Sequence, residues 1–154
     1  MTAAPPSDVL FYHLKRQPLE AVLPALIEKT LERGWRAVVQ AGTQERLAAL
    51  DETLWTYRPD SFLAHGTARD PMPEAQPVYL TTGDDTPNAA GVRFLVDGAE
   101  VAAFGGFVRI VVLFNGQDEA ALAQARAQWK AAKAQGCSVA YWQQAESGRW
   151  EKKA

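Results

Sequence analysis

The run from Val108 to Phe114 (VRIVVLF) constrains the fold more than any other part of the chain. It is a nearly continuous apolar stretch, and an extended strand points its side chains alternately to opposite faces of a sheet. A strand of this composition must therefore be buried on both faces, which is typical of a central strand in a parallel sheet covered by helices. Asn115-Gly116 supplies a turn that ends the strand.

Shorter apolar runs and helical patterns alternate along the rest of the chain. The expected strands are 9–14, 36–41, 77–82, 92–96 and 138–144, and the expected helices run from Leu19 to before Gly34, from Thr43 through Leu54, and from about Asp118 to Gln135. Pro24 falls inside the first helical pattern and predicts either a kink or a later helix start. Alternating strands and helices predict right-handed crossovers and an open, mostly parallel α/β sheet with helices on both faces.

The length of the chain favours a single domain spanning residues 1–154. At 154 residues and 47% hydrophobic composition, the chain can bury one core but is too short for two ordinary domains. Residues 1–8 are expected to be flexible. The segment 58–77 contains four prolines and follows no periodicity, so it is expected to form a long loop.

Charge and cysteine content exclude several classes of protein. The net charge of −2 and the pI near 5.7 argue against binding of duplex DNA or anionic membranes through the overall field of the protein. Cys137 is the only cysteine, so one chain can form neither a disulfide framework nor a multi-cysteine zinc site. No basic and apolar leader and no membrane-length apolar run is present, which predicts a cytoplasmic protein.

Residues suited to catalysis or cofactor binding are scarce. The first strand-to-helix turn reads KRQP over residues 15–18, so it lacks the glycines of a phosphate-binding turn, and its proline removes an amide donor. The glycine-rich FGGF at 104–107 precedes a strand and is interpreted as a turn or bulge. His13 and His65 have no acidic or thiol partner at ligand spacing and are expected to be structural. Asp84-Asp85 is interpreted as a solvated turn, with cation binding as the alternative. The sequence therefore predicts no catalytic, metal or cofactor site.

The helix after the apolar strand carries an unusual face. Arg126, Trp129, Lys130 and Lys133 are spaced i, i+3, i+4 and i+7, so they share one side of the helix. These residues could form an ordinary solvated face with Trp129 covering the edge of the core. They could instead bind an acidic, hydrophobic peptide, and the tryptophan among the cations favours this second interpretation.

A second aromatic stretch, LWTYRPDSFLAH, covers residues 54–65. Its aromatic residues lie at the end of a helix and in a proline-containing loop, where burial is not assured. Docking to a partner and packing of the loop onto the sheet are equally compatible with these residues.

In their order and spacing, several segments resemble the chi subunit of bacterial DNA polymerase III. They are VLFYHL, LWTYRPDSFLAH, VVLFNG, ARAQWKAAKAQG and YWQQAESGRWEKK, and together they span nearly the whole chain. The resemblance implies a Rossmann-like fold without nucleotide binding and a non-catalytic role in the clamp-loader assembly. Chi proteins bind the acidic, phenylalanine-terminated tail of the single-stranded-DNA-binding protein and link it to the polymerase through the psi subunit.

The resemblance also implies roles for particular residues. The tail-binding pattern of the family falls on Arg126, Trp129 and Lys130, whereas Lys133 is added from helix geometry alone. Trp55 and Phe62 correspond to the surface that faces psi or another clamp-loader component. Ala64 stands where many relatives have proline, so this loop can differ from theirs. Direct nucleic-acid binding is expected to be weak or absent, and the alternative function is a small α/β enzyme or nucleotide-binding protein that uses the ligand edge of the sheet.

Overall fold

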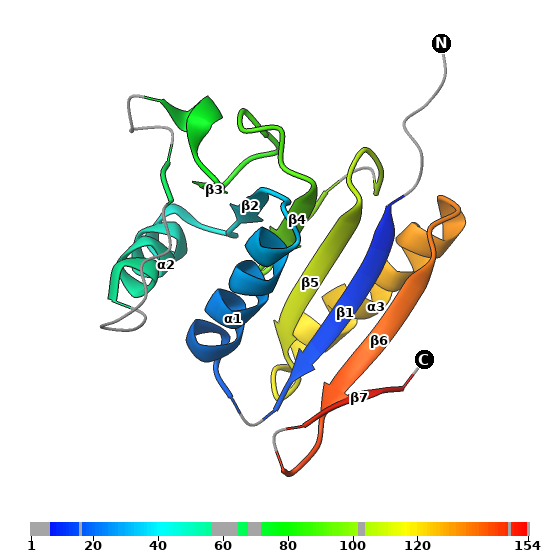
Figure 1. The fold of residues 1–154 in the computed structure, drawn as a ribbon. Coiled ribbons are helices and arrows are strands. Elements are labelled where there is room, and N and C mark those ends of the chain that lie inside the picture. Colours follow the sequence, from blue (N-terminus) through cyan, green and yellow to red (C-terminus); the bar gives the residue numbers. More distant parts are fainter. Residues whose placement is uncertain are drawn as a thin grey trace.

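The computed structural model describes residues 7–15, 17–56, 65–67, 72–101, 104–147 and 149–153, without the side chains of Trp55 and Thr56. One sheet of seven strands has the order β3-β2-β4-β5-β1-β6-β7 (Figure 1). Every neighbouring pair is parallel except β6 and β7. The predicted open, mostly parallel α/β sheet is therefore confirmed, and β5, the apolar run, is its central strand.

The elements follow the predicted alternation closely. The strands are β1 (Asp8–Leu14), β2 (Ala37–Gln40), β3 (Val78–Thr81), β4 (Val92–Leu95), β5 (Arg109–Asn115), β6 (Val139–Gln144) and β7 (Trp150–Lys152). The helices are α1 (Leu19–Glu32), α2 (Gln44–Thr56) and α3 (Glu119–Ala134), with a short 3₁₀ helix, η1 (Pro73–Ala75).

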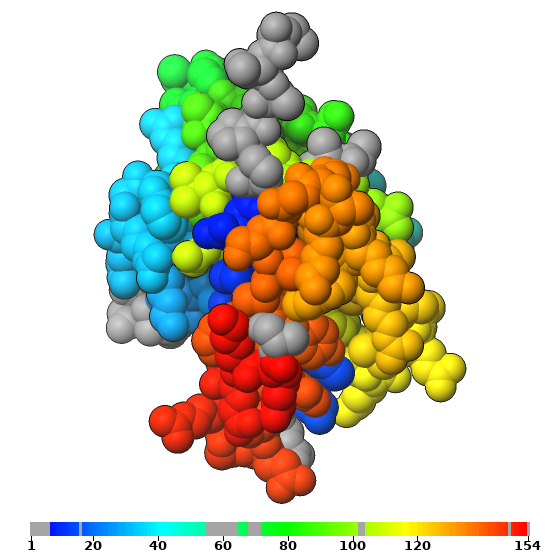
Figure 2. Space-filling model, turned by 90° about the vertical axis from the view of Figure 1, so that its right-hand side faces the viewer, coloured from blue at the N-terminus to red at the C-terminus, as the bar shows by residue number. Residues whose placement is uncertain are grey.

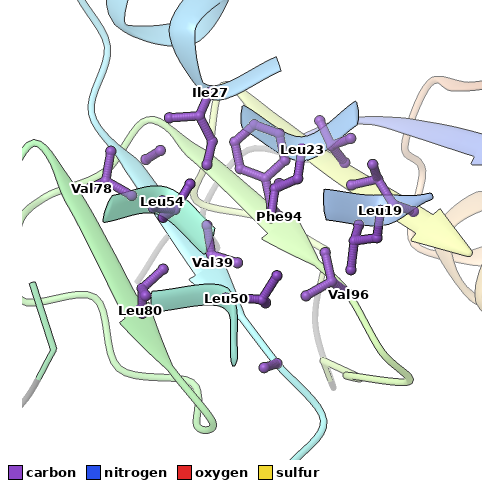
Figure 3. Close-up of a cluster of buried hydrophobic side chains, with 14 of the residues drawn as sticks. Leu19, Leu23, Ile27, Val39, Leu50, Leu54, Val78, Leu80, Phe94 and Val96 are labelled. Atoms are coloured by element: carbon purple, nitrogen blue, oxygen red, sulfur yellow. The ribbon is translucent and has the colours of Figure 1, made fainter. Parts of the chain in front are cut away.

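Of three apolar clusters, the two larger ones form cores on opposite faces of the sheet, and the third is a small cluster of Val38, Tyr79 and Ala90. On one face, leucine and isoleucine side chains of α1 and α2 pack against Val39, Phe94 and neighbouring strand residues (Figure 3). On the other face, Ala125 and Ala132 of α3 pack against Phe11 and Ile110. Consecutive residues of β5 alternate between the cores, with Val111 in the first and Val112 in the second. This alternation explains why residues 110–114 of the strand are all apolar.

The structure departs from the sequence-based expectations at three places. Strand β7 was not predicted, because its three residues include Glu151 and Lys152 and form a strand only by antiparallel pairing with β6. Pro24 is buried inside α1, which begins at Leu19, so the proline does not delay the helix start. Strand β1 begins at Asp8 and Ser7 is buried, so these two residues are held in the fold although residues 1–8 were expected to be flexible.

Within the predicted loop 58–77, described residues contact the sheet at Gly66 and at Pro77, whose carbonyl accepts a hydrogen bond from the Ala37 amide of β2 at 2.9 Å. Gly66 forms a parallel β-bridge with Tyr79, and η1 follows before β3. Residues 57–64 and 68–71 lie outside the described part of the chain. No helix among the described residues is long and apolar enough to cross a membrane.

Arg93 of β4 is a buried cation that fastens a loop to the sheet. Its side chain, in a residue only 1% exposed, donates to Gln40 Oε1 at 2.9 and 2.6 Å, to the Gly83 carbonyl at 2.5 Å and to Thr86 Oγ1 at 3.0 Å. The guanidinium also lies 5.7 Å from the centre of the Phe107 ring. A buried cation needs acceptors for its N–H donors. Because the acceptors of Arg93 belong to β2 and to the connection between β3 and β4, its side chain joins β4 to both.

We expect Arg93→Ala to lower the free energy of unfolding by about 3 kcal/mol or more, since it leaves buried acceptors without donors and opens a cavity. Urea unfolding followed by circular dichroism measures this change. The matched control, Arg149→Ala, removes an exposed arginine and should change stability by less than about 0.5 kcal/mol. Equal losses in the two variants would contradict the structural role of Arg93.

Candidate peptide-binding groove

Helix α3 begins and ends at well-defined signals, which fixes the position of its side chains. Asp118 caps the helix, and its carboxylate accepts hydrogen bonds from the amides of Ala120 at 2.9 Å and Ala121 at 3.3 Å. Gly136, with a φ of 84°, follows the last turn. Ala125 and Ala132 are buried against the sheet, so α3 approaches β5 and β6 closely.

A groove of about 330 Å³ lies beside α3, between the helix and strands β5 and β6. Its apolar lining comes from both sides, and the residues are Phe114, Leu122, Ala125, Trp129 and Tyr141. Arg126 and Lys130 also line it, and both are exposed residues. The site is thus an aromatic and aliphatic hollow with two cations at its open side.

Trp129 serves the core and the groove together. Its ring centre lies 5.4 Å from that of Phe11 and 6.1 Å from that of Tyr141, and the side chain is partly buried in the core on the α3 side. The two interpretations of this face that the sequence left open are therefore compatible, because the same tryptophan covers the core edge and forms a groove wall.

The four predicted site residues do not contribute equally to the groove. Arg126, Trp129 and Lys130 all line it, whereas Lys133 is absent from its lining. The Lys133 ammonium nitrogen lies 5.4 Å from the centre of the Trp129 ring instead. Lys133 is therefore placed to interact with the tryptophan and not with the interior of the groove.

Sequence reasoning missed the residues that form the rest of the groove. Leu122 and Ala125 were not singled out from the sequence. Phe114 and Tyr141 lie on β5 and β6, the strands before and after α3 in sequence, but no local pattern shows that they lie beside one another under the helix. Tyr141 faces α3 because it pairs with Phe11, and Phe11 belongs to the core on that side. The pairing of Tyr141 with Phe11 would have identified Tyr141 as a groove residue, but this pairing can be inferred only once β6 is known to lie beside β1.

Comparison with known proteins identifies the family. Residues 7–140 match the family model described as DNA polymerase III chi subunit, HolC. The chain belongs to this family. The matched range contains all of α3 and ends one residue before Tyr141. Most of the groove of this chi-family chain therefore lies within the matched range.

A curated relative agrees with the family assignment. The protein of Rickettsia prowazekii (strain Madrid E) described as probable DNA polymerase III subunit chi is 30% identical over 91 residues, which are 59% of this chain. The alignment covers 55% of the length of that relative.

The second predicted partner surface of this chi-family chain is only partly visible. Trp55 belongs to α2, but its side chain lies outside the described residues, as does Phe62. Nearby, His65 Nε2 lies 2.8 Å from Asp51 Oδ1 of α2, and the His65 side chain is fully buried. His65 therefore has an acidic partner that sequence spacing did not reveal, and this pair ties residue 65 to α2.

Two other candidates from the sequence have structural contacts. Asp85 accepts hydrogen bonds from the Tyr79 hydroxyl at 2.6 Å and from the Thr81 hydroxyl, so it is not simply a solvated carboxylate. Gly106 has a φ of 83°, in agreement with a turn at the FGGF segment. Among the residues that the structure describes, no group of three or more potential metal ligands is found.

The usual ligand edge of a doubly wound sheet is also present, as a crevice of about 770 Å³ at the carboxyl ends of β4, β5 and β1. Its helix termini are unsuited to phosphate. The Asp118 carboxylate already accepts from the first amides of α3. Arg46 lies 2.7 Å from Glu20 and 3.1 Å from Asp97, so nearby carboxylates compensate its charge. Acidic groups at these positions disfavour a bound nucleotide.

His13 forms a hydrogen bond with Tyr141, although His13 itself does not line the groove. Its Nδ1 lies 2.5 Å from the Tyr141 hydroxyl, and a side chain at Gly116 would overlap the imidazole. Burial lowers the pKa of His13, and the positive charge of Lys15 lowers it further. Burial raises the pKa of Tyr141, and the nearby charge of Arg126 opposes this rise. The pair therefore favours a neutral imidazole beside a neutral phenol.

The lowered pKa of His13 predicts a loss of stability in mild acid. The unfolded chain takes up the proton first as pH falls through about 6.5, so the contribution of neutral His13 is fully present above that pH and decreases below it. Between about pH 7.5 and about pH 5.5, the wild type should lose more unfolding free energy than His13→Asn, which does not titrate there. Urea unfolding of both proteins at the two pH values gives these losses, and an equal loss in the wild type and in His13→Asn would contradict the lowered pKa of His13.

Proposed function

We propose that this chi-family chain is a non-catalytic adaptor of the replicative DNA polymerase. In this proposal, its α3 groove binds the acidic C-terminal tail of the single-stranded-DNA-binding protein, and a psi-like partner links the chain to the clamp loader. The observation that carries the proposal is the pairing of an aromatic hollow with Arg126 and Lys130 at its open side. Such a site suits a hydrophobic residue that bears a negative charge.

Each part of a phenylalanine-terminated tail has a chemical counterpart in the groove. The terminal ring fits among Phe114, Trp129 and Tyr141, since aromatic rings pack well in edge-to-face arrangements. The α-carboxylate and the preceding acidic side chains fit Arg126 and Lys130, which can form charge-assisted hydrogen bonds. Within such a tail, only the C-terminal phenylalanine carries an aromatic ring and a free α-carboxylate on the same residue, so the groove suits the last residue of a chain.

Lys133 has a smaller role in this proposal. Its ammonium group lies against Trp129 and outside the groove, so it stabilises the tryptophan wall and contributes weakly to the field. Its removal should therefore weaken binding less than removal of Arg126.

The link to the clamp loader rests on the family resemblance of the segment that contains Trp55 and Phe62. Helix α2, to which Trp55 belongs, packs on the face of the sheet opposite α3, so an adaptor can hold both partners at the same time. Replacement of these two aromatics should abolish binding of the psi-like partner without affecting tail binding.

The alternative is a nucleotide-binding protein or small enzyme that uses the crevice at the sheet edge. The acidic groups there argue against it. Thermal unfolding in the presence of a nucleotide panel separates the two functions, because a ligand that binds the native state raises the melting temperature. A large shift with any nucleotide would favour the alternative.

A fluorescent peptide that ends in several aspartates and a C-terminal phenylalanine tests the groove directly. Arg126→Ala and Lys130→Ala should each weaken binding by roughly 1.5 to 3 kcal/mol, as expected for loss of a charge-assisted hydrogen bond. Fluorescence anisotropy gives the dissociation constants.

Two control variants sharpen this experiment. Arg149→Ala removes an exposed arginine whose residue does not line the groove and should leave affinity unchanged. Lys133→Ala should have an intermediate effect. Affinity that stays at the wild-type level in both Arg126→Ala and Lys130→Ala would eliminate the groove as the tail site.

A further inference from the structure

The face of the sheet on the α1 side is unevenly covered. Helix α1 packs on β2 and β5, and none of the described helices lies over β6 and β7 on this side (Figure 1). Parallel sheets are normally covered by helices on both faces. We call the uncovered region the open face and define it by Leu10, Tyr12, Trp142, Trp150 and Lys152. Strand register places these residues on one side, because Tyr12 pairs with Trp142 and Trp142 pairs with Lys152.

The open face is aromatic and only partly buried. The Tyr12 ring stacks beside Trp142 at 6.4 Å and meets the Trp150 ring edge-on at 5.0 Å. Leu10 and Trp142 are partly exposed and belong to none of the three described apolar clusters. The indole nitrogen of Trp142 is shielded from solvent and has no acceptor in the described part of the chain. A fourth covering element would complete the burial of this surface.

Positive charges surround this apolar surface. A groove of about 180 Å³ runs between α1 and β1, and Lys29, Arg33 and Arg109 line it with Leu10 and Tyr12. Lys152 lies on the opposite border, beside Trp142. In the described residues, none of these four cations forms a salt bridge. In the space-filling view, dark-blue β1 residues reach the surface between the light-blue end of α1 and the orange segment (Figure 2).

Carboxylates are few on this side. Asp8 shares the face, at the amino end of β1, where it pairs in register with Arg109. Glu32 of α1 lies only about 60° around the helix from Lys29, and Glu28 lies about 100° from it, because successive helical residues are about 100° apart. The four cations Lys29, Arg33, Arg109 and Lys152 still outnumber the carboxylates Asp8, Glu28 and Glu32. Glu151 points to the other face of the sheet, since strand side chains alternate. The open face therefore has a net positive character in a chain whose net charge is −2.

We propose that the open face binds an acidic amphipathic helix of a partner protein. Three adjacent strands span two gaps of about 4.8 Å, so β1, β6 and β7 offer a strip about 10 Å wide, which matches one helix diameter. The apolar stripe of the partner helix packs on Leu10, Tyr12 and Trp142, just as α1 packs on β2 and β5. Carboxylates along its flanks reach Arg33 on one side and Lys152 on the other.

Single-stranded nucleic acid suits this surface less well. Bases stack on open aromatic faces, whereas Tyr12 is already stacked against Trp142 and contacted by the edge of Trp150. The proposal is independent of tail binding, because α3 and its groove lie on the other side of the sheet.

Site-specific crosslinking in cells tests the proposal with the full chain. A Trp142→p-benzoylphenylalanine variant should crosslink on irradiation to a partner segment that is net negative and has apolar residues at i, i+3, i+4 and i+7, identified by mass spectrometry. A crosslink to nucleic acid, to a second copy of the chain or to a segment without this pattern would overturn it, as would no crosslink.

Charge reversal supplies the second arm. Adding Arg33→Glu and Lys152→Glu, both at exposed positions, should lower the crosslink yield about tenfold or more, whereas Arg149→Glu should not. The tail peptide should still bind the charge-reversed chain, which also shows that it folds. Arg126→Ala should leave the crosslink unchanged, so failure of the tail site and failure of the open face are distinguishable. An undiminished yield after charge reversal would contradict the proposal.

Discussion

Burial of β5 on both faces is the constraint on which the rest of the structure depends. Because its residues alternate between two cores, helices must cover the sheet from both sides, and α3 supplies the cover on the side of Val112 and Ile110. Ala125 and Ala132 let that helix approach closely. The larger Leu122 and Trp129 then leave a hollow beside β6, into which Phe114 and Tyr141 project. The groove is thus a consequence of how α3 packs.

Much of the fold could be predicted because its signals are local. Apolar runs and helical spacing identify all elements except β7 and η1, whose three residues each carry no sufficient pattern. The site was only half predictable. Helical spacing brings Arg126, Trp129 and Lys130 together, but Phe114 and Tyr141 join them through strand order, which depends on contacts between distant parts of the chain. The His65–Asp51 pair was missed for the same reason.

The distribution of charge separates the surfaces of the molecule. At the carboxyl edge of the sheet, where related architectures bind nucleotides, Asp118 accepts hydrogen bonds from the first amides of α3, and Arg46 pairs with Glu20 and Asp97. Beside α3 and on the open face, by contrast, exposed cations border aromatic residues. In this chi-family chain, the features suited to recognition therefore lie on the two sides of the sheet and not at its edge, an arrangement that supports the proposed adaptor role.

In the proposed complex, the Arg126 guanidinium meets the terminal carboxylate of the bound tail, and a double-mutant cycle measures the strength of that contact. The cycle combines wild-type and Arg126→Ala chains with the tail peptide carrying either a free or an amidated C-terminus. We expect a coupling energy of about 1.5 kcal/mol or more between the guanidinium and the carboxylate. A coupling energy near zero, with amidation equally damaging in both chains, would contradict it.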